Sequence, residues 1–195
     1  MLSHKKSLDI LRKTNALLEG HFVLSSGLHS SKYIQCAKLL SFPHKAEKIC
    51  KSLATKNKKK FKNFDLILSP AMGGIIIGYE IGKIIKKETI FCERVSGKFA
   101  LRRGFEIKKG SKVLIIEDVI TTGKSSLECV KLIKKAKASL LGFATIIDRS
   151  SKKSLKIKKS IVSHLKIDVP TYTQNQLPKD LKSISITIPG SRYIK

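Results

Sequence analysis

The residues with the clearest chemical potential lie in one short segment, Val113-Leu-Ile-Ile-Glu-Asp-Val-Ile-Thr-Thr-Gly-Lys-Ser125. An apolar run leads to two adjacent carboxylates, Glu117 and Asp118, and then to hydroxyls, a glycine and the expected start of a helix. Backbone N–H groups at a helix N-terminus bind a phosphate dianion, and a glycine lets the phosphate approach closely. The carboxylates would repel that phosphate, but they suit sugar hydroxyls or a cation beside them. The segment therefore predicts a site for a sugar phosphate.

Two other interpretations of this segment are weaker. Its end resembles a Walker A loop, but that motif also requires a glycine at the start of the loop, and no glycine lies between residues 113 and 122. A nucleoside triphosphatase is therefore disfavoured. The structural alternative is a strand that ends in two solvated acids before a capped helix. It leaves unexplained why two mutually repelling carboxylates directly follow an apolar run.

A second glycine-bearing turn follows another apolar run. Leu66–Leu68 precedes Ser69-Pro-Ala-Met-Gly-Gly74, and a helical pattern comes next. In a parallel α/β sheet the carboxyl ends of the strands share one edge. This loop is therefore expected beside the first one.

Short branched apolar runs alternate with helical segments, which predicts an α/β fold with a right-handed, doubly wound parallel sheet. Buried parallel strands have this continuous apolar character because both faces of the sheet are covered. The expected strands are 66–68, 89–92, 113–116 and 140–147, and the expected helices are roughly 7–18, 45–54, 74–86 and 125–137.

Glycine spacing adds two further expectations. Glycines at 74, 78 and 82 form a smooth stripe that would let one helix lie close against the sheet, and the lysines that follow exclude a membrane pairing motif. The stretch 96–110 holds three glycines with little periodicity, which predicts a long loop or a flexible two-stranded arm of the kind that acts as a lid. The lysine-rich stretch 150–159 is expected to be a surface connection.

The net charge of +26 suggests nucleic-acid binding, because basic side chains neutralise phosphates. Only six of the 40 basic residues are arginines, although arginine is the better reader of phosphates and bases. The lysines are spread along the whole chain, so a compositional bias is favoured over a specific nucleic-acid surface. The positive field would still help to capture a small polyanionic substrate.

The cysteines and the termini indicate an intracellular setting. Four cysteines lie far apart in sequence, so neither a zinc knuckle nor a C-x-x-C motif is present, and we expect them reduced and buried. No apolar stretch reaches the ~18 residues that a membrane span requires, and residues 1–12 lack the apolar centre of a signal peptide. We therefore expect a soluble, cytoplasmic protein without membrane partners.

The segment 113–125 resembles the phosphoribosyl pyrophosphate (PRPP) signature of the type I phosphoribosyltransferases. The resemblance implies the fold of that family, an α/β domain with a parallel-stranded, Rossmann-like core sheet flanked by helices. It also implies a single domain over 1–195, with a core at about 45–165, a small hood mainly from 1–40 and 165–195, and a mobile loop at about 95–110. The PRPP-binding residues implied are Ala71, Met72, Gly73, Gly74, Glu117, Asp118, Val119, Ile120, Thr121, Thr122, Gly123, Lys124 and Ser125.

Three further segments resemble the orotate phosphoribosyltransferases within that family: residues 20–37, Leu101-Arg-Arg-Gly-Phe105 with Arg94, and 188–192. The resemblance implies orotate-binding residues Ser26, Gly27, Thr121 and Arg149. Arg149 suits the orotate carboxylate, because a guanidinium matches a carboxylate as a bidentate fork. It implies catalytic residues Arg94, Lys98, Arg102, Arg103 and Asp118. The chain departs from the more familiar bacterial branch at Ser25 and Gly73, where that branch has lysines, and it has no histidine between 93 and 109.

The reaction implied is displacement of pyrophosphate from PRPP by a ring nitrogen of orotate, giving orotidine 5′-monophosphate for UMP synthesis. Mg²⁺ would be held mainly by PRPP, with no direct protein ligand, and a homodimer would share the mobile loop between subunits. Two rivals stay open at this point. One is a purine phosphoribosyltransferase, and the other is an RNA-binding regulator with the same fold, suggested by the high charge.

Overall fold

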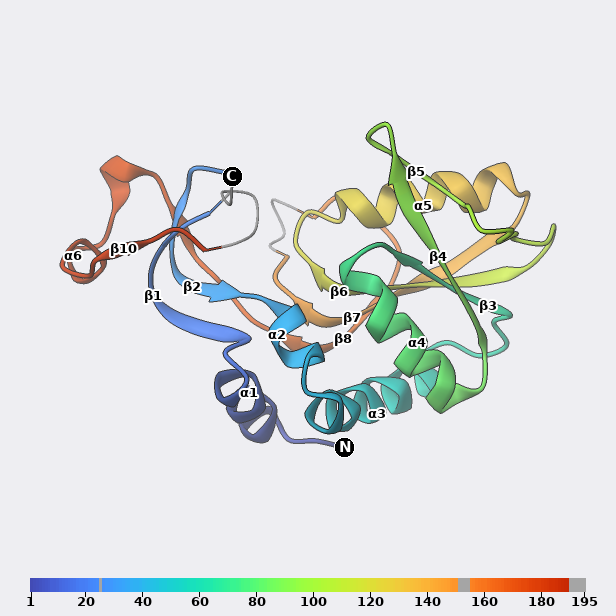
Figure 1. Cartoon of the computed structure of the whole chain (residues 1–195), viewed down its shortest axis with the longest axis horizontal. Coiled ribbons are helices and arrows are strands. Elements are labelled where there is room, and N and C mark those ends of the chain that lie inside the picture. Colours follow the sequence, from blue (N-terminus) through green and yellow to red (C-terminus); the bar gives the residue numbers. More distant parts are fainter. Residues whose placement is uncertain (25, 151–154, 190–195) are drawn as a thin grey trace.

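The computed structural model describes residues 1–24, 26–150 and 155–189 (Figure 1). Within these residues a six-stranded core sheet has the strand order β5-β4-β3-β6-β7-β8, and a smaller four-stranded sheet has the order β10-β1-β2-β9. The core strands are β3 (Leu66–Pro70), β4 (Glu88–Val95), β5 (Lys98–Ala100), β6 (Lys112–Ile120), β7 (Ser139–Asp148) and β8 (Ile161–Lys166).

The core sheet is parallel except for β5, and helices cover both of its faces. Leu114 and Ile116 of β6 join an apolar cluster with α3 (Pro43–Lys60) and α4 (Gly73–Ile85). Val113 and Ile115 point the other way, into a cluster with α5 (Lys124–Lys135). Burial on both faces explains the unbroken apolar run of β6. The predicted α/β fold with a doubly wound, mainly parallel sheet is confirmed.

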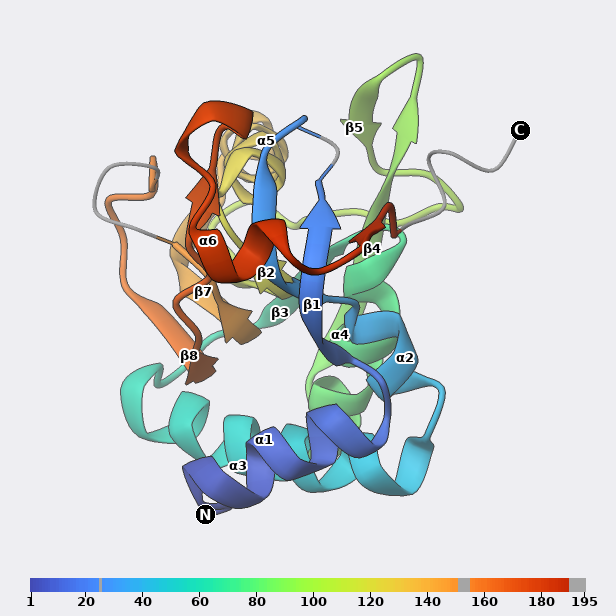
Figure 2. The same cartoon turned by 90° about the vertical axis from the view of Figure 1, so that its left-hand side faces the viewer.

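The smaller sheet joins a segment from the N-terminal part of the chain with two segments from its C-terminal part (Figure 2). Its central hairpin joins β1 and β2, and two short C-terminal strands flank that hairpin. A buried histidine links the ends, because His21 Nε2 lies 2.7 Å from His29 Nδ1 and His21 Nδ1 lies 3.1 Å from the carbonyl oxygen of Ile184. We call this sheet the hood; its strands and nearby short elements are β1 (Leu17–Val23), β2 (His29–Ile34), β9 (Thr171–Tyr172), β10 (Ile186–Thr187), the 3₁₀ helix Gln174–Gln176 and α6 (Lys179–Lys182).

The first helix is shorter than the predicted 7–18. It is α1 (His4–Lys13), which begins after the capping residue Ser3. It stops because Asn15 adopts a left-handed conformation with φ of 54°, which asparagine tolerates and which ends a helix. Leu17 then starts β1 and pairs with Ile34 of β2. The prediction of helix for residues 14–18 was wrong.

Two other elements differ from the sequence pattern. The helix expected at 45–54 is α3, which starts at Pro43 and continues to Lys60, where a run of lysines complements the helix dipole. A short helix, α2 (Cys36–Leu40), precedes it. The sequence pattern does not predict β8, because Ser163 and His164 interrupt its apolar run. His164 is nevertheless buried there, with Nε2 at 2.8 Å from Ser7 Oγ of α1.

The glycine stripe of α4 lies against the sheet, as predicted. A Cβ atom at Gly74 would lie 3.1 Å from the carbonyl oxygen of Ile116, and one at Gly78 would overlap Ser69. A Cβ at Gly82 would likewise overlap Thr89. The close approach sets the height of α4 over β3, and with it the place where the loop before α4 meets the sheet edge.

Filling this stripe is expected to destabilise the fold. Gly78→Val should lower the free energy of unfolding by about 1–3 kcal/mol, because the side chain has to push α4 away from Ser69. Urea denaturation measures the change. Ile76→Val is the matched control, since Ile76 lies on the same helix with 54% of its surface exposed. A Gly78→Val variant as stable as this control would contradict the packing role of the stripe.

The cysteines follow the sequence prediction: Cys36, Cys50, Cys92 and Cys129 are all buried and free. The sulfur atoms of Cys92 in β4 and Cys129 in α5 lie 3.4 Å apart. Among the residues described, no helix is long and apolar enough to pass through a bilayer.

Candidate functional site

Two loops meet at the carboxyl edge of the core sheet and border a cleft of about 280 Å³. One loop follows β3 and leads into α4, where it contributes Gly73 and Gly74. The other follows β6 and leads into α5, and the cleft is lined there by Glu117, Asp118 and Ser125. Since β3 and β6 are neighbouring parallel strands, the two loops lie side by side, as the sequence pattern predicts.

The first loop touches the second directly at a glycine. A Cβ atom at Gly73 would lie 2.7 Å from both carboxylate oxygens of Asp118. Any side chain at this position would therefore displace Asp118. Ala71 also lines the cleft and its N–H donates to the carbonyl oxygen of Cys92 at 2.7 Å, whereas the Met72 side chain is 82% exposed.

Of the two acids near the end of β6, Glu117 is buried and Asp118 is half-buried at the cleft. Burial raises the pKa of Glu117 to about 7; the nearby Ser126 hydroxyl opposes this rise and the Asp118 carboxylate adds to it. Burial also raises the pKa of Asp118, although backbone N–H groups at 118 and 119 oppose the change. Oε1 of Glu117 is buried without a hydrogen-bond partner among the described residues. Buried polar oxygens are normally paired, so this atom favours a ligand that donates a hydrogen bond.

The raised pKa of Glu117 predicts a pH-dependent stability. Between the unfolded value of 4.5 and the folded value of about 7, the unfolded chain releases the proton first, so native stability falls as pH rises through this window. Glu117→Gln does not titrate and should escape this loss. The variant should gain about 2–3 kcal/mol relative to wild type between pH 4.5 and 7.5, measured by urea denaturation without ligands. A constant difference across this range would contradict the buried, protonated state.

The loop that the sequence predicts to bind phosphate runs from Thr121 to Gly123 at the start of α5, and we call it the phosphate loop. Gly123 has φ of 73°, and a Cβ there would lie 2.6 Å from Ile157, so glycine suits both the conformation and the space. The side chains of Thr121, Thr122 and Lys124 are exposed at the loop, beside Ser125. Helix α5 directs its first N–H groups toward the same end, which is the arrangement that binds a phosphate.

Four residues of the predicted PRPP segment, 117–120, precede this loop and are still part of β6. Val119 lines the cleft and is partly buried. The Ile120 side chain is 1% exposed and packs in the core cluster with α5, so it does not face the cleft. Its backbone carbonyl oxygen accepts a hydrogen bond from the Arg149 N–H at 2.8 Å.

Arg149 follows β7 directly and lies next to Tyr33 of β2 and Cys36 of α2. Burial lowers the pKa of the Arg149 guanidinium, while Tyr33 and Cys36 oppose that shift. Its Nε is buried with no hydrogen-bond partner in the described parts of the chain. Cys36 also connects to the acids, with Sγ 3.8 Å from the carbonyl oxygen of Asp118. A buried polar atom without a partner is costly, and an anion that accepts a hydrogen bond from the Arg149 Nε–H would compensate it.

The other predicted orotate-binding residues lie at the turn of the β1–β2 hairpin. Gly27 has φ of 77°, and its N–H donates to the carbonyl oxygen of Leu24 at 2.8 Å. Ser26 is exposed on this turn, whereas Ser25 and the segment 190–192 lie outside the described residues. No contact joins Ser26 or Gly27 to Arg149 among the hydrogen bonds of the described residues.

The stretch predicted as a long loop or two-stranded arm includes a β hairpin formed by β4 and β5, which projects from the core sheet (Figures 1 and 2). Arg94 of β4 lines the cleft together with Phe99 of β5. Lys98 is exposed at the start of β5. The hairpin thus brings the cation of Arg94 to the cleft.

Arg102 and Arg103 lie elsewhere. Both pair with Glu93, at 3.9 Å and 3.3 Å between charged atoms, and Arg103 also lies 5.8 Å from the centre of the Phe91 ring. Glu93 precedes Arg94 in β4, and successive strand residues face opposite sides. Neither arginine lines the cleft in this conformation, so the structure does not bring them together with Arg94.

Sequence reasoning missed four residues of this region: Tyr33 and Cys36 near Arg149, and Phe99 and Glu128 near Arg94. Phe99 faces Arg94 across the tight β4–β5 hairpin, whereas the other three residues reach their places through contacts between distant segments. Glu128 lies one turn into α5 and pairs with Arg94 at 2.8 Å across 34 residues of sequence. The sequence offered one signal for Glu128, namely an acidic residue close to the start of the helix that follows the phosphate loop.

Similarity to known proteins decides among the chemistries that this cleft could support. Residues 40–178 match the phosphoribosyl transferase domain. The chain belongs to the phosphoribosyltransferase family. It is 42% identical over 194 residues to the orotate phosphoribosyltransferase of Parvibaculum lavamentivorans, with 99% of this chain and 100% of that protein covered.

Solved phosphoribosyltransferases share the fold. The orotate phosphoribosyltransferase of Aeropyrum pernix superimposes with a TM-score of 0.69 at 20% identity, covering 82% of this chain and 92% of that one. An adenine phosphoribosyltransferase from Saccharomyces cerevisiae has a TM-score of 0.61 at 15% identity, covering 81% of this chain and 99% of that one. At these identities the structural similarity shows the type I phosphoribosyltransferase fold.

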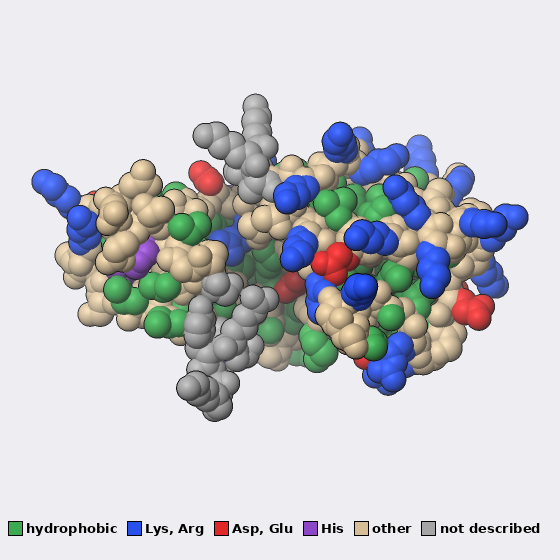
Figure 3. All heavy atoms as spheres, turned by 90° about the horizontal axis from the view of Figure 1, so that it is seen from above, with side chains coloured by type: hydrophobic (Ala, Val, Ile, Leu, Met, Phe, Trp, Pro, Cys, Tyr) green, Lys and Arg blue, Asp and Glu red, His purple; other side chains and the backbone are tan. Residues whose placement is uncertain are grey.

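The surface of this phosphoribosyltransferase bears on the nucleic-acid alternative. Lysine and arginine side chains are scattered over the visible face of the core, with apolar and acidic side chains between them (Figure 3). They do not gather there into one continuous stripe. This distribution agrees with a compositional bias rather than with a dedicated nucleic-acid surface.

Proposed function

We propose that this phosphoribosyltransferase transfers the ribose 5-phosphate group of PRPP to orotate, releasing pyrophosphate and forming orotidine 5′-monophosphate for UMP synthesis. The observation that carries the proposal is the cleft itself, which combines two adjacent acids, the start of α5 and a second glycine loop at one sheet edge. The nearly full-length similarity to an orotate phosphoribosyltransferase selects the acceptor. The reaction is a cytoplasmic step.

Each part of PRPP has a suitable partner in this cleft. Thr121 to Ser125 would bind the 5′-phosphate through hydroxyls and N–H groups at the start of α5. Glu117 and Asp118 would accept hydrogen bonds from the ribose hydroxyls, which satisfies the unpaired Oε1 of Glu117. The pyrophosphate would lie along the loop 71–74, near Arg94.

The acceptor would bind between the core and the hood. Arg149 would pair with the orotate carboxylate, which compensates its buried Nε. Thr121, Ser26 and Gly27 would add polar contacts around the ring. Because the partner of Arg149 must be an anion, a neutral purine base is the poorer fit.

The chemical step separates charge, and the cleft would stabilise both sides of it. Positive character develops on the ribose near Asp118, and negative charge develops on pyrophosphate near Arg94. The described residues hold no group of three or more metal-ligating side chains, and the cleft offers two carboxylates. Carboxylate oxygens are ligands that Mg²⁺ prefers, and Mg²⁺ held mainly by PRPP would neutralise the leaving group.

Residues 95–110, which include the tip of the β4–β5 hairpin and the chain after it, would act as a lid over the cleft. Closure would exclude water from the activated sugar. Lys98, Arg102 and Arg103 would supply positive charge only after closure, since both arginines are paired with Glu93 here. We propose a homodimer in which this loop reaches the neighbouring subunit's site.

The test is to incubate the protein with PRPP, Mg²⁺ and either orotate or hypoxanthine and to follow both bases. Orotate should be consumed in step with pyrophosphate release. Consumption of hypoxanthine with orotate untouched would show that the acceptor is a purine.

RNA binding is measured in a second experiment. Sequence-selective affinity that survives about 200 mM salt would favour the RNA-binding regulator, because nonspecific binding falls steeply with salt.

A further inference from the structure

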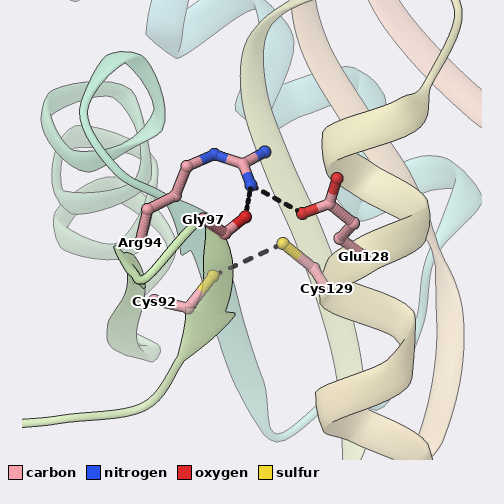
Figure 4. Close-up of polar contacts among 5 residues, drawn as sticks. All are labelled: Cys92, Arg94, Gly97, Glu128 and Cys129. Carbon is pink, nitrogen blue, oxygen red and sulfur yellow. Dashed lines mark hydrogen bonds and ion pairs between the residues drawn. The ribbon is translucent and has the colours of Figure 1, made fainter.

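Glu128 is an acid beside the cleft for which neither the motifs nor the proposed reaction provides a role. It lies one turn into α5, the helix that starts at the phosphate loop, and its side chain is 22% exposed. Its Oε2 accepts a hydrogen bond from Arg94 Nη1 at 2.8 Å (Figure 4). The pair therefore connects the helix that would bind the 5′-phosphate with the strand that carries a cation to the pyrophosphate side.

Arg94 is held by two contacts besides Glu128. Nη1 also donates to the carbonyl oxygen of Gly97 at 2.7 Å, and the guanidinium lies 4.1 Å from the centre of the Phe99 ring. The carbonyl of Gly97 is itself fixed, because Ser96 and Gly97 have φ of 48° and 78° in the tight turn between β4 and β5. The three contacts determine both the direction and the plane of the guanidinium.

The pattern of these bonds leaves one edge of Arg94 available. Both hydrogen bonds that the described residues make to Arg94 use the same atom, Nη1. The Nε and Nη2 hydrogens lie on the other edge of the planar group, and this edge matches two phosphate oxygens as a fork. Arg94 lines the cleft, so a ligand there can reach that edge.

The backbones that carry the pair are fastened together beneath it. Cys92 lies two residues before Arg94 on the same face of β4, and Cys129 follows Glu128 in α5. Their sulfur atoms lie 3.4 Å apart and both residues are fully buried (Figure 4). Strand and helix are thus packed without a gap at this level, and the side chains of Arg94 and Glu128 meet on a rigid base.

We propose that Glu128 is a positioning residue of the transfer reaction, which holds Arg94 so that its Nε–Nη2 edge is presented to the departing pyrophosphate. The inference rests on the proposed function. The carboxylate also offsets part of the positive charge of Arg94, so two effects compete. We expect the effect on orientation to be the larger one. Misplacing a catalytic group can lower the rate about 100-fold. An exposed ion pair contributes only about 0–1 kcal/mol, so the partial neutralisation of Arg94 by Glu128 costs little.

The test compares Glu128→Ala, Glu128→Gln, Arg94→Ala and the Glu128→Ala/Arg94→Ala double variant by steady-state kinetics. Glu128→Ala should lower kcat/KM for PRPP about tenfold and leave KM for orotate unchanged, and Arg94→Ala should lower kcat/KM for PRPP about 100-fold. The double variant should be no worse than Arg94→Ala, since Glu128 acts only through Arg94. Glu128→Gln should lose less than Glu128→Ala, because its amide oxygen still accepts from Nη1.

Controls separate this inference from folding and from the proposed function. Glu47→Gln removes the exposed ion pair with Lys51, which is 2.8 Å long and lies on α3, and should keep wild-type kinetics. Calorimetric titration with Mg²⁺ and pyrophosphate should show weaker binding for Glu128→Ala, whichever base the enzyme accepts. The positioning role would be overturned if the double variant lost kcat/KM for PRPP by the product of the two single losses. It would also be overturned if Glu128→Gln were faster than wild type. Should Glu128→Ala not fold, Glu128→Gln must still bind pyrophosphate more weakly than wild type, or the role is refuted.

Discussion

Asp118→Asn is expected to lower kcat by about 10²–10³-fold while the protein stays folded. The carboxylate lies within contact distance of the loop at Gly73 and stands where positive character would develop on the ribose. Asparagine keeps the shape but loses the charge that opposes this positive character. Burial already raises the pKa of Asp118, so the neutral side chain removes a desolvation cost and should not weaken the native state.

The measurement is kcat at saturating PRPP and orotate, together with urea denaturation of the same preparations. Asp9→Asn is the matched control, because Asp9 forms an exposed ion pair with Lys13 at 2.9 Å, far from the cleft. The control should have wild-type turnover. Near-normal turnover of Asp118→Asn would remove the central residue from the proposed mechanism.

Arg149→Ala is expected to raise KM for orotate by about 100-fold and to change KM for PRPP by less than about threefold. Arg149 is half-buried near Tyr33 and Cys36, and its partial burial lowers the pKa of the guanidinium. Its Nε is buried without a hydrogen-bond partner among the described residues, so an anionic ligand would compensate the desolvation of this atom. Its removal should therefore leave the ligand-free protein as stable as wild type. PRPP would bind in the cleft beside Asp118 and away from Arg149, so KM for PRPP should change little.

Arg149→Lys sharpens this prediction. Lysine keeps the charge but not the planar fork, so an intermediate loss in orotate affinity is expected. Arg12→Ala, which removes an exposed pair with Glu19 at 3.0 Å, is the control for loss of an arginine at the surface. Equal losses for PRPP and orotate in Arg149→Ala would contradict a role in acceptor binding.

Much of the site follows from local sequence. The order of apolar strand, acids, hydroxyls and glycine between Val113 and Ser125 predicts the start of α5 to within one residue, because each step has a local cause. The strand itself continues to Ile120, four residues past the expected end at 116. Gly123 is a further example, since its left-handed conformation and the space beside Ile157 both suit glycine. The adjacency of the two loops also follows, because neighbouring parallel strands share their carboxyl edge.

Other features depend on contacts between distant residues. The end of α1 at Asn15, the β8 strand around His164 and the hood built from both chain ends are decided by partners far away in sequence. Arginines 94, 102 and 103 look equivalent in the sequence, yet only Arg94 faces the cleft. The reason is strand alternation, which turns Arg94 toward Glu128 and Glu93 toward the other two.

Local chemistry therefore specified the fold class and the phosphate and sugar loops, since backbone conformation and helix starts depend on neighbouring residues. The tertiary structure alone decided which charges meet: Arg149 with the hood, Arg94 with Glu128, and Arg102 and Arg103 with Glu93. Long side chains reach several partners, and only the packing of strands and helices selects one of them.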